Sequence, residues 1–230
     1  MVSSGSGVNT SAFWERFWRT SGIQFVGLCI VAYLIYGYQP AAGASSDALG
    51  AFYGGDRLRI LIAAVFSGLA ILNLMWFATA IRLTLADAGV DGWGAAATAS
   101  SAAVGGLFIL LASINTALAY SIAASGNSTF LPAMNGFFWS CFVLSAFPRA
   151  MLIMSAAFGL WRAGLISNML FTVGVACVVL GVLGGTTWAS GGFWAPDGVY
   201  SRFILPIISL AWVVVVNQVL ARTPVARTGW

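Results

Sequence analysis

The sequence contains no lysine and no histidine, and these two absences exclude whole classes of function. A retinal Schiff base needs a lysine, and haem iron and most zinc or copper sites need histidine ligands. The HExxH pattern of metalloproteases and the usual histidine base of a serine hydrolase are missing for the same reason. We therefore expect a protein that carries neither a metal nor an organic cofactor.

Charge of either sign is also scarce. Charged residues make up 7% and hydrophobic residues 60% of the 230 residues, whereas an ordinary soluble domain has roughly 25% charged residues. Several apolar runs reach the roughly 20 residues that cross a hydrocarbon core of about 30 Å. The sequence predicts an all-α bundle of about six transmembrane helices forming one domain, with spans near residues 22–38, 60–83, 95–123, 136–160, 165–187 and 203–220.

The basic residues are all arginines, and they stand singly near the ends of the apolar runs. They form no basic stripe, which argues against a nucleic-acid partner. Short cytoplasmic loops carry an excess of arginine, so we predict that both termini are cytoplasmic. This orientation places six arginines inside (Arg16, Arg19, Arg82, Arg162, Arg222 and Arg227) and three outside (Arg57, Arg59 and Arg202), the latter matched in number by Asp47, Asp56 and Asp197.

The first apolar run allows a second interpretation. Basic residues precede it and Ala42-Gly43-Ala44 follows it, as in a cleavable signal peptide. Against cleavage, the segment before the run is long, and the run itself contains the polar side chains of Gln24, Tyr33 and Tyr36. The five later spans are expected in either case.

Residues suited to catalysis are few. All six acidic residues lie in predicted loops or tails, so no buried carboxylate pair is expected for aspartyl chemistry or a proton relay. Cys29, Cys141 and Cys177 fall in different apolar runs, where a thiol behaves as a small hydrophobic group. An enzyme is therefore disfavoured, although Asp56, Asp197 and the outer arginines leave a surface site open.

One arginine does not fit the loop pattern. Arg149, in the stretch SAFPRAM, lies near the middle of the fourth predicted span, where an arginine costs about 2.5–3.5 kcal/mol on insertion scales. Pro148 is expected to kink the helix, because it has no N–H to donate to the carbonyl of Leu144. Arg149 could hold an anionic ligand together with Ser145 on the same helical face. Alternatively, it could satisfy backbone carbonyls, pair with a loop aspartate or extend to the inner interface.

Other polar side chains could complete a ligand site. Asn73 and Asn115 are the deepest amides in the predicted spans, although such amides more often hydrogen-bond between helices. Trp194 and Asp197 belong to the loop GGTTWASGGFWAPDGVYSRF, which could cover the outer mouth of the bundle or lie flat at the interface. The predicted ligand-binding residues are thus Arg149, Ser145, Asn73, Asn115, Trp194 and Asp197.

Tryptophans and small residues predict how the bundle packs. Trp139 stands where the outer interface is expected, and indole rings favour such interfaces. Small residues four positions apart, such as Ala97 with Ser101 and Gly181 with Gly185, let helices approach closely. We therefore expect the third and fifth spans at the centre of the bundle.

Several stretches resemble one group of proteins. AFYGGDRLRILIA (51–63) with LMWFATAIR (74–82), PRAMLIMSAAFGLWRAG (148–164) and the loop at 184–203 are similar to uncharacterised bacterial membrane proteins of about six spans, common in actinobacteria. The resemblance covers most of the chain and implies a multi-pass protein of the bacterial inner (plasma) membrane. It implies no activity, because the group has none established.

Two functional hypotheses follow. In the first, the protein binds or transports a small anionic or amphipathic ligand in a cavity near Arg149. In the second, it is a non-catalytic subunit that docks through its small-residue faces on another membrane protein or on a second copy of itself, with Arg149 meeting an acidic residue of the partner. The lipid bilayer surrounds the protein in both.

Overall fold

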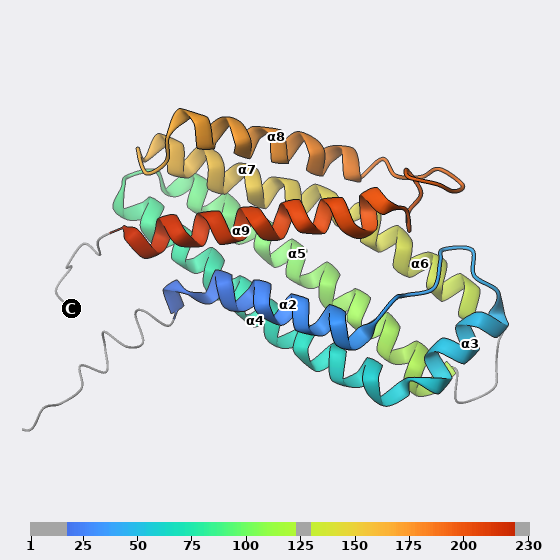
Figure 1. Ribbon diagram of the computed structural model, residues 1–230. Coiled ribbons are helices and arrows are strands. Elements are labelled where there is room, and N and C mark those ends of the chain that lie inside the picture. Colours follow the sequence, from blue (N-terminus) through green and yellow to red (C-terminus); the bar gives the residue numbers. More distant parts are fainter. Residues whose placement is uncertain (1–17, 123–129, 224–230) are drawn as a thin grey trace, which may run out of the picture.

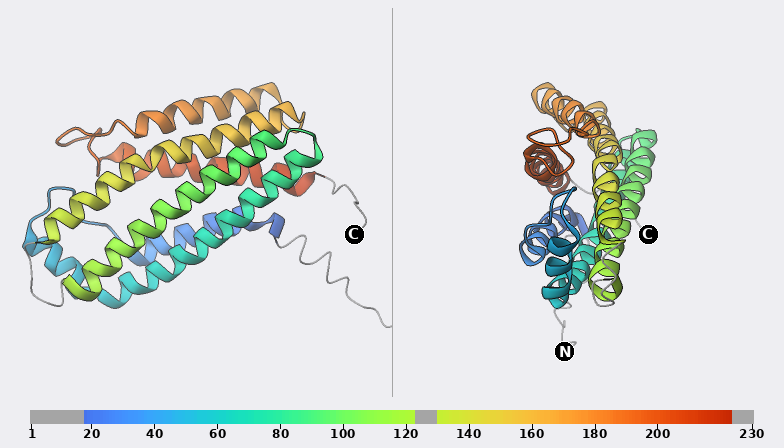
Figure 2. Two further views of the ribbon diagram at one scale, coloured as in Figure 1. Left: turned by 180° about the vertical axis from the view of Figure 1, so that it is seen from behind. Right: turned by 90° about the vertical axis from the view of Figure 1, so that its right-hand side faces the viewer.

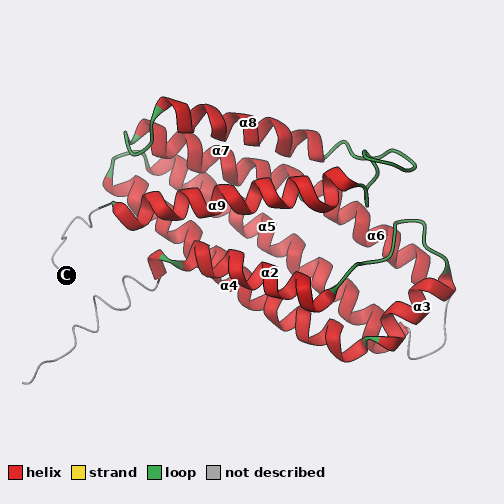
Figure 3. Cartoon of the chain, viewed as in Figure 1, coloured by secondary structure: helices red, strands yellow, loops and turns green. Residues whose placement is uncertain are grey.

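A computed structural model describes residues 18–122 and 130–223, and helices joined by loops account for all of this part of the chain, with no strand in it (Figures 1 and 3). The predicted inner residues Arg16 and Arg227 lie outside the described residues. In chain order the elements are α2 (Ser21–Tyr36), α3 (Ser46–Gly55), α4 (Arg57–Asp87), α5 (Asp91–Ala117), the π-helical turn η1 (Leu118–Ile122), α6 (Phe130–Leu144), α7 (Ala146–Arg162), α8 (Asn168–Gly184), the π-helical turn η2 (Tyr200–Ile204) and α9 (Leu205–Arg222).

The helix lengths identify a membrane protein. Four helical stretches are long and apolar enough to cross a membrane: Arg57–Asp87, Asp91–Tyr120, Phe130–Arg162 and Tyr200–Arg222. Two further apolar helices, α2 and α8, are shorter, with 16 and 17 residues. The predicted all-helical class is confirmed, and each of the six predicted spans overlaps one of these helices.

The helices run side by side in an elongated bundle, which the right-hand view of Figure 2 shows end-on. α4 packs between α2 and α5, α7 packs between α5 and α8, and α9 lies against α2 and α8. Arg19 Nη1 donates to the carbonyl of Thr223 at 2.7 Å, so the two ends of the described chain meet. We call this end of the bundle the terminal end and the opposite one the α3 end.

The short helix α3 lies between the first two predicted spans, where the sequence predicted only a connecting loop. Ser45 caps it by accepting a hydrogen bond from the backbone N–H of Ala48, and Asp47 in its first turn complements the positive end of the helix dipole. Leu49 and Tyr53, four residues apart, are fully buried and hold α3 against the ends of neighbouring helices. A two-residue apolar stripe is too weak a periodic signal to predict such a helix from the sequence.

Small residues allow close packing on both α5 and α8, but only one of the two helices lies where it was predicted. On α5, Ala97 and Ser101 are buried, and Ser101 Oγ donates to the carbonyl of Leu74 on α4 at 3.4 Å. α8 also makes a close approach, since a Cβ at Gly181 would lie 3.0 Å from the Cβ of Ala150 on α7. The expectation that α8 lies at the centre is nevertheless wrong: it lies at the edge of the bundle (Figure 1), and only three of its residues, all glycines, are buried.

Adding a methyl group at Gly174 should loosen the packing of α8. A Cβ there would stand 2.7 Å from the Trp212 ring and 2.8 Å from the Cβ of Ala157. We expect Gly174→Ala to lower stability by about 1–3 kcal/mol and therefore to lower the Tm, at roughly 2–4 °C per kcal/mol. Gly106→Ala on α5 is the matched control, because nothing lies within 4 Å of its Cβ position. Thermal unfolding in detergent tests this, and equal Tm values for both variants would contradict it.

A candidate ligand cavity between the helices

A cavity of about 480 Å³ lies among α2, α4, α5, α6, α7 and α9. Its volume falls within the roughly 300–1,000 Å³ range of small-molecule sites. Most of its wall is apolar, with contributions from Phe25, Ala63, Leu74, Phe108, Leu111, Ile153, Trp212 and Val216 among others. Two arginines, Arg149 and Arg202, also line it, and each has at least nine-tenths of its surface buried.

Arg149 lies beside a break between α6 and α7. The two helices form one apolar stretch, but α6 ends at Leu144 and α7 begins at Ala146. The break follows from Pro148, which cannot donate to the carbonyl of Leu144, as predicted. Arg149 donates from Nε to the carbonyl of Ser145 at 3.1 Å and from Nη2 to that of Phe142 at 3.3 Å. Its side chain thus satisfies backbone carbonyls at the break, one of the roles expected from the sequence.

These carbonyls leave the charge of Arg149 without a counter-ion. The two ion pairs found in the described chain join Arg59 to Asp56 and Arg82 to Asp91, both near helix ends. Nη1 of Arg149 makes no hydrogen bond to any described residue. A buried guanidinium with backbone acceptors alone remains a strong attractor for an anion.

Arg202 is the second cavity arginine, and the sequence did not predict this role. It was expected at the outer surface beside Asp197, but the structure places only the backbone carbonyl of Asp197, not its carboxylate, near Nε, at 3.2 Å. Nη1 donates to the carbonyl of Gln39 at 2.9 Å. Nη2 has no hydrogen-bond partner within the two described segments. The guanidinium group of Arg202 is therefore in the same situation as that of Arg149: it is buried, it donates to backbone carbonyls, and no carboxylate pairs with it.

Two aromatic rings connect the arginines. The guanidinium of Arg202 lies 4.9 Å from the centre of the Trp139 ring, and that of Arg149 lies 5.2 Å from the centre of the Phe142 ring. The two rings pack edge to face with centres 5.7 Å apart. Cation–π contacts of this kind are typically worth about 0.5–2 kcal/mol. Both guanidinium groups therefore contact aromatic rings of the same helix, α6.

The expectation that Trp139 anchors the protein at the interface is wrong. Its side chain is 4% exposed, and Nε1 donates to the carbonyl of Pro40 at 3.1 Å. The position near a helix end suggested an interface, but the neighbouring 39–42 segment folds over the ring. Asn135, one turn earlier on α6, holds the same segment in place: its Nδ2 donates a hydrogen bond to the carbonyl of Ala41 at 2.7 Å.

Polar groups gather where the cavity approaches the α3 end. Tyr53 donates to Asn115 Oδ1 at 3.1 Å, and the hydroxyls of Tyr36 and Tyr53 lie 3.4 Å apart. Burial raises the pKa of Tyr53 above its ordinary value of about 10, so its phenol stays protonated and remains a donor. Gln39 also lines the cavity, and its buried Nε2 makes no hydrogen bond in the described chain.

The structure brings together only part of the predicted site. Arg149 and Asn115 line the cavity. Ser145 is fully buried, but its hydroxyl donates to the carbonyl of Phe142 at 2.6 Å and the residue is not part of the wall. Asn73 is half-buried and turns its amide back onto its own helix, where Nδ2 donates to the carbonyl of Leu69 at 2.9 Å.

Trp194 and Asp197 also lie away from the cavity. Trp194 Nε1 donates to the carbonyl of Thr186 at 2.9 Å, and its ring packs on Tyr200 with centres 4.6 Å apart. The loop thus folds on itself at the end of α8 instead of reaching over the bundle. Asp197 contributes only its carbonyl, which positions Arg202.

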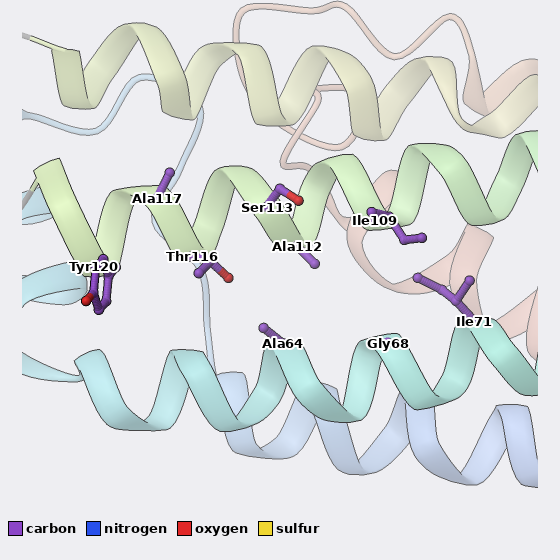
Figure 4. A pocket seen from close by; sticks show the side chains of 9 residues that line it. All are labelled: Ala64, Gly68, Ile71, Ile109, Ala112, Ser113, Thr116, Ala117 and Tyr120. Carbon is purple, nitrogen blue, oxygen red and sulfur yellow. The ribbon is translucent and has the colours of Figure 1, made fainter.

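A second hollow lies on the outside of the bundle between α4 and α5 (Figure 4). It is a shallow groove whose floor has small residues on both helices, including Ala64, Gly68 and Ala112. At the α3 end it is bounded by Tyr120, whose ring lies 4.5 Å from the guanidinium carbon of Arg57. Ala64 and Ala112 also line the central cavity, so the groove and the cavity share a thin wall.

Comparison with protein-family models, with curated proteins and with solved structures finds no match to the chain. The functional argument therefore rests on the geometry of the cavity and its two arginines.

Proposed function

We propose that the protein binds, and moves across or within the membrane, a small anionic amphipathic ligand held in the central cavity. One observation carries this proposal: two buried arginines, Arg149 and Arg202, line the same largely apolar cavity, and neither is paired with a carboxylate. Buried charges in proteins are normally paired. An anion that enters such a site replaces the missing counter-ion.

The apolar part of the cavity wall indicates what the ligand carries besides its anionic group. Because apolar side chains from six helices surround the arginines, a purely ionic ligand would leave most of this wall facing water. A ligand with a hydrocarbon part removes that apolar surface from water, which contributes about 25 cal/mol per Å² buried. The preferred ligand therefore has an anionic group and a hydrocarbon body.

For the topology, we propose six spans with both termini in the cytoplasm of a bacterium. At 16 and 17 residues, α2 and α8 approach the lower limit of roughly 17 residues for a spanning helix. The ends of the described chain lie at the same end of the bundle, as an even number of crossings requires. Arg19, Arg82, Arg162 and Arg222 lie toward that end, in agreement with an excess of arginine inside.

The subunit hypothesis has its best support in the α4/α5 groove. Small residues on its floor would allow the close approach of a helix from another protein. Arg149, however, is 7% exposed and lies inside the bundle, so it is not available to an acidic residue on a partner's surface. Isolation of a stoichiometric second protein in mild detergent would support the subunit role, and repeated isolation of the chain alone would reject it.

The proposed function predicts a selective response to head-group charge. The wild-type protein in lipid nanodiscs should bind a fluorescent long-chain carboxylate at least tenfold more tightly than the matched alcohol, because a charge-assisted hydrogen bond contributes about 1.5–3 kcal/mol. The matched amine should bind more weakly still, because the arginines repel it. Fluorescence titration tests this order. Equal affinities for the three head groups would contradict the proposal.

A further inference from the structure

The exposed residues of the cavity wall gather at one place in the described chain. Among its lining residues in the described chain, four are exposed: Ile30 and Tyr33 on α2, Phe203 on η2 and Ile207 on α9. Their exposed fractions range from 37% to 63%. All other lining residues are buried or half-buried. The mouth of the cavity is therefore a slot between α2 and the η2–α9 helix, and we call it the α2/α9 slot.

Within the described residues, hydrogen bonds join the two sides of the slot only beyond its ends. At the terminal end, the backbone N–H of Gly22 donates to Asn217 Oδ1 at 2.9 Å. At the α3 end, Arg202 donates to the carbonyl of Gln39. Between these two contacts, no hydrogen bond links α2 to α9 within residues 18–122 and 130–223. Side-chain packing alone closes the slot, so it can widen without breaking a polar contact.

The local backbone also favours an opening here. Pro206 has no N–H to donate to the carbonyl of Arg202, four residues earlier, and the chain forms the π-helical turn η2 at this point. π-helical turns occur often at functional sites. This turn carries both Phe203, on the rim of the slot, and Arg202, in the cavity wall.

The rim is apolar except for the hydroxyl of Tyr33. In the proposed six-span topology, both α2 and α9 cross the membrane, so the rim faces the bilayer. A water-soluble anion would have to cross hydrocarbon to reach this mouth, whereas a lipid already has its chain at that level. A cavity of about 480 Å³ is of the size that accepts drug-sized ligands, which favours one hydrocarbon chain over two.

We propose that the ligand is a single-chain lipid with an anionic head group, a carboxylate or a phosphate, and that it enters the cavity sideways from the membrane through the α2/α9 slot. This inference rests on the proposed function and adds to it the ligand class and the route. The head group moves past the rim to Arg202 and Arg149, while the chain lies along the apolar wall.

Blocking the rim should slow entry. We would reconstitute the wild type, Ile30→Trp and Ile207→Trp in vesicles and follow binding after mixing with vesicles loaded with a fluorescent long-chain carboxylate or a matched alkyl phosphate. Both variants should associate with the probe at least tenfold more slowly. Leu34→Trp is the control: Leu34 is 72% exposed on α2 and is not part of the cavity wall, so this variant should keep the wild-type rate.

A substitution that widens the slot provides a second test, because a misfolded variant would not bind the probe faster. Tyr33→Ala removes a ring from the rim and should speed both association and release of the probe. The wild type could bind the probe while Ile30→Trp, Ile207→Trp and Tyr33→Ala all keep its association and release rates. This result would overturn the route and leave the proposed function intact. Failure of the wild type to bind either anionic probe would overturn both. Binding of only one probe would identify the head group as a carboxylate or a phosphate.

Discussion

Replacing Arg149 with glutamine should weaken binding of a long-chain carboxylate by roughly ten- to a hundredfold. Glutamine keeps an amide NH2 group that can donate to a backbone carbonyl, as Arg149 does to Ser145 and Phe142, but it removes the charge that the described chain leaves without a counter-ion. Loss of a charge-assisted hydrogen bond in a buried site is worth about 1.5–3 kcal/mol, which corresponds to this range. Titration of the fluorescent carboxylate into nanodiscs measures it.

Three controls separate the loss of charge from damage to the fold. The matched neutral alcohol should bind Arg149→Gln as well as it binds the wild type. Arg149→Lys keeps a charge but loses the planar fork of donors. Its affinity for the carboxylate should therefore lie between those of the wild type and Arg149→Gln. Arg202→Gln removes the other cavity charge. It should likewise weaken binding of the carboxylate but not of the alcohol. If carboxylate and alcohol lose affinity in parallel in Arg149→Gln, the arginine acts only on the structure.

Filling the cavity should weaken binding of every ligand of this class. Ala63 on α4 is 2% exposed and lines the cavity wall, so Ala63→Phe places a ring in the space that the hydrocarbon chain needs. We expect binding of both the carboxylate and the alcohol to fall by more than tenfold, because the apolar contacts are lost whatever the head group.

The same substitution makes a distinctive prediction for stability. Extra side-chain volume in a filled core costs about 1–3 kcal/mol, but a ring that extends into a cavity avoids this overpacking, so the Tm should not fall. Ala102→Phe, on the exposed face of α5, is the matched control and should bind normally. Unchanged probe affinity in a well-folded Ala63→Phe protein would show that the ligand site lies elsewhere.

Much of the fold was predictable, because hydrophobic run length is a strong signal. The predicted spans 60–83, 136–160 and 203–220 lie within helices long enough to cross a membrane, and the span 95–123 overlaps a fourth, Asp91–Tyr120. Such runs must be helical, since the hydrocarbon core leaves backbone groups no other partners. The central position assigned to α8 was wrong because Gly181 and Gly185 reveal that a helix makes one close contact, not how many neighbours it has.

The site was predicted only in part, for reasons that particular residues make clear. Arg149 stood out because it lies deep in an apolar run beside Pro148. Arg202 lies at the start of such a run, where an arginine also fits the loop pattern, and only the packing of Gln39 and Trp139 shows that it is buried. Pro206, four residues later, was the available signal, since both cavity arginines accompany a proline that breaks regular helix geometry. Asn73 lies outside the cavity wall, because depth along a helix does not determine which face an amide occupies.

The most direct test of the central claim is an experimental density map of the wild-type protein purified from its own membranes. Our account predicts elongated density in the cavity, with one end within hydrogen-bond distance of Arg149 Nη1 or Arg202 Nη2 and the other against the apolar wall. A map in which an acidic side chain of the protein occupies that position, or in which the helices close around the arginines and leave no cavity, would contradict it.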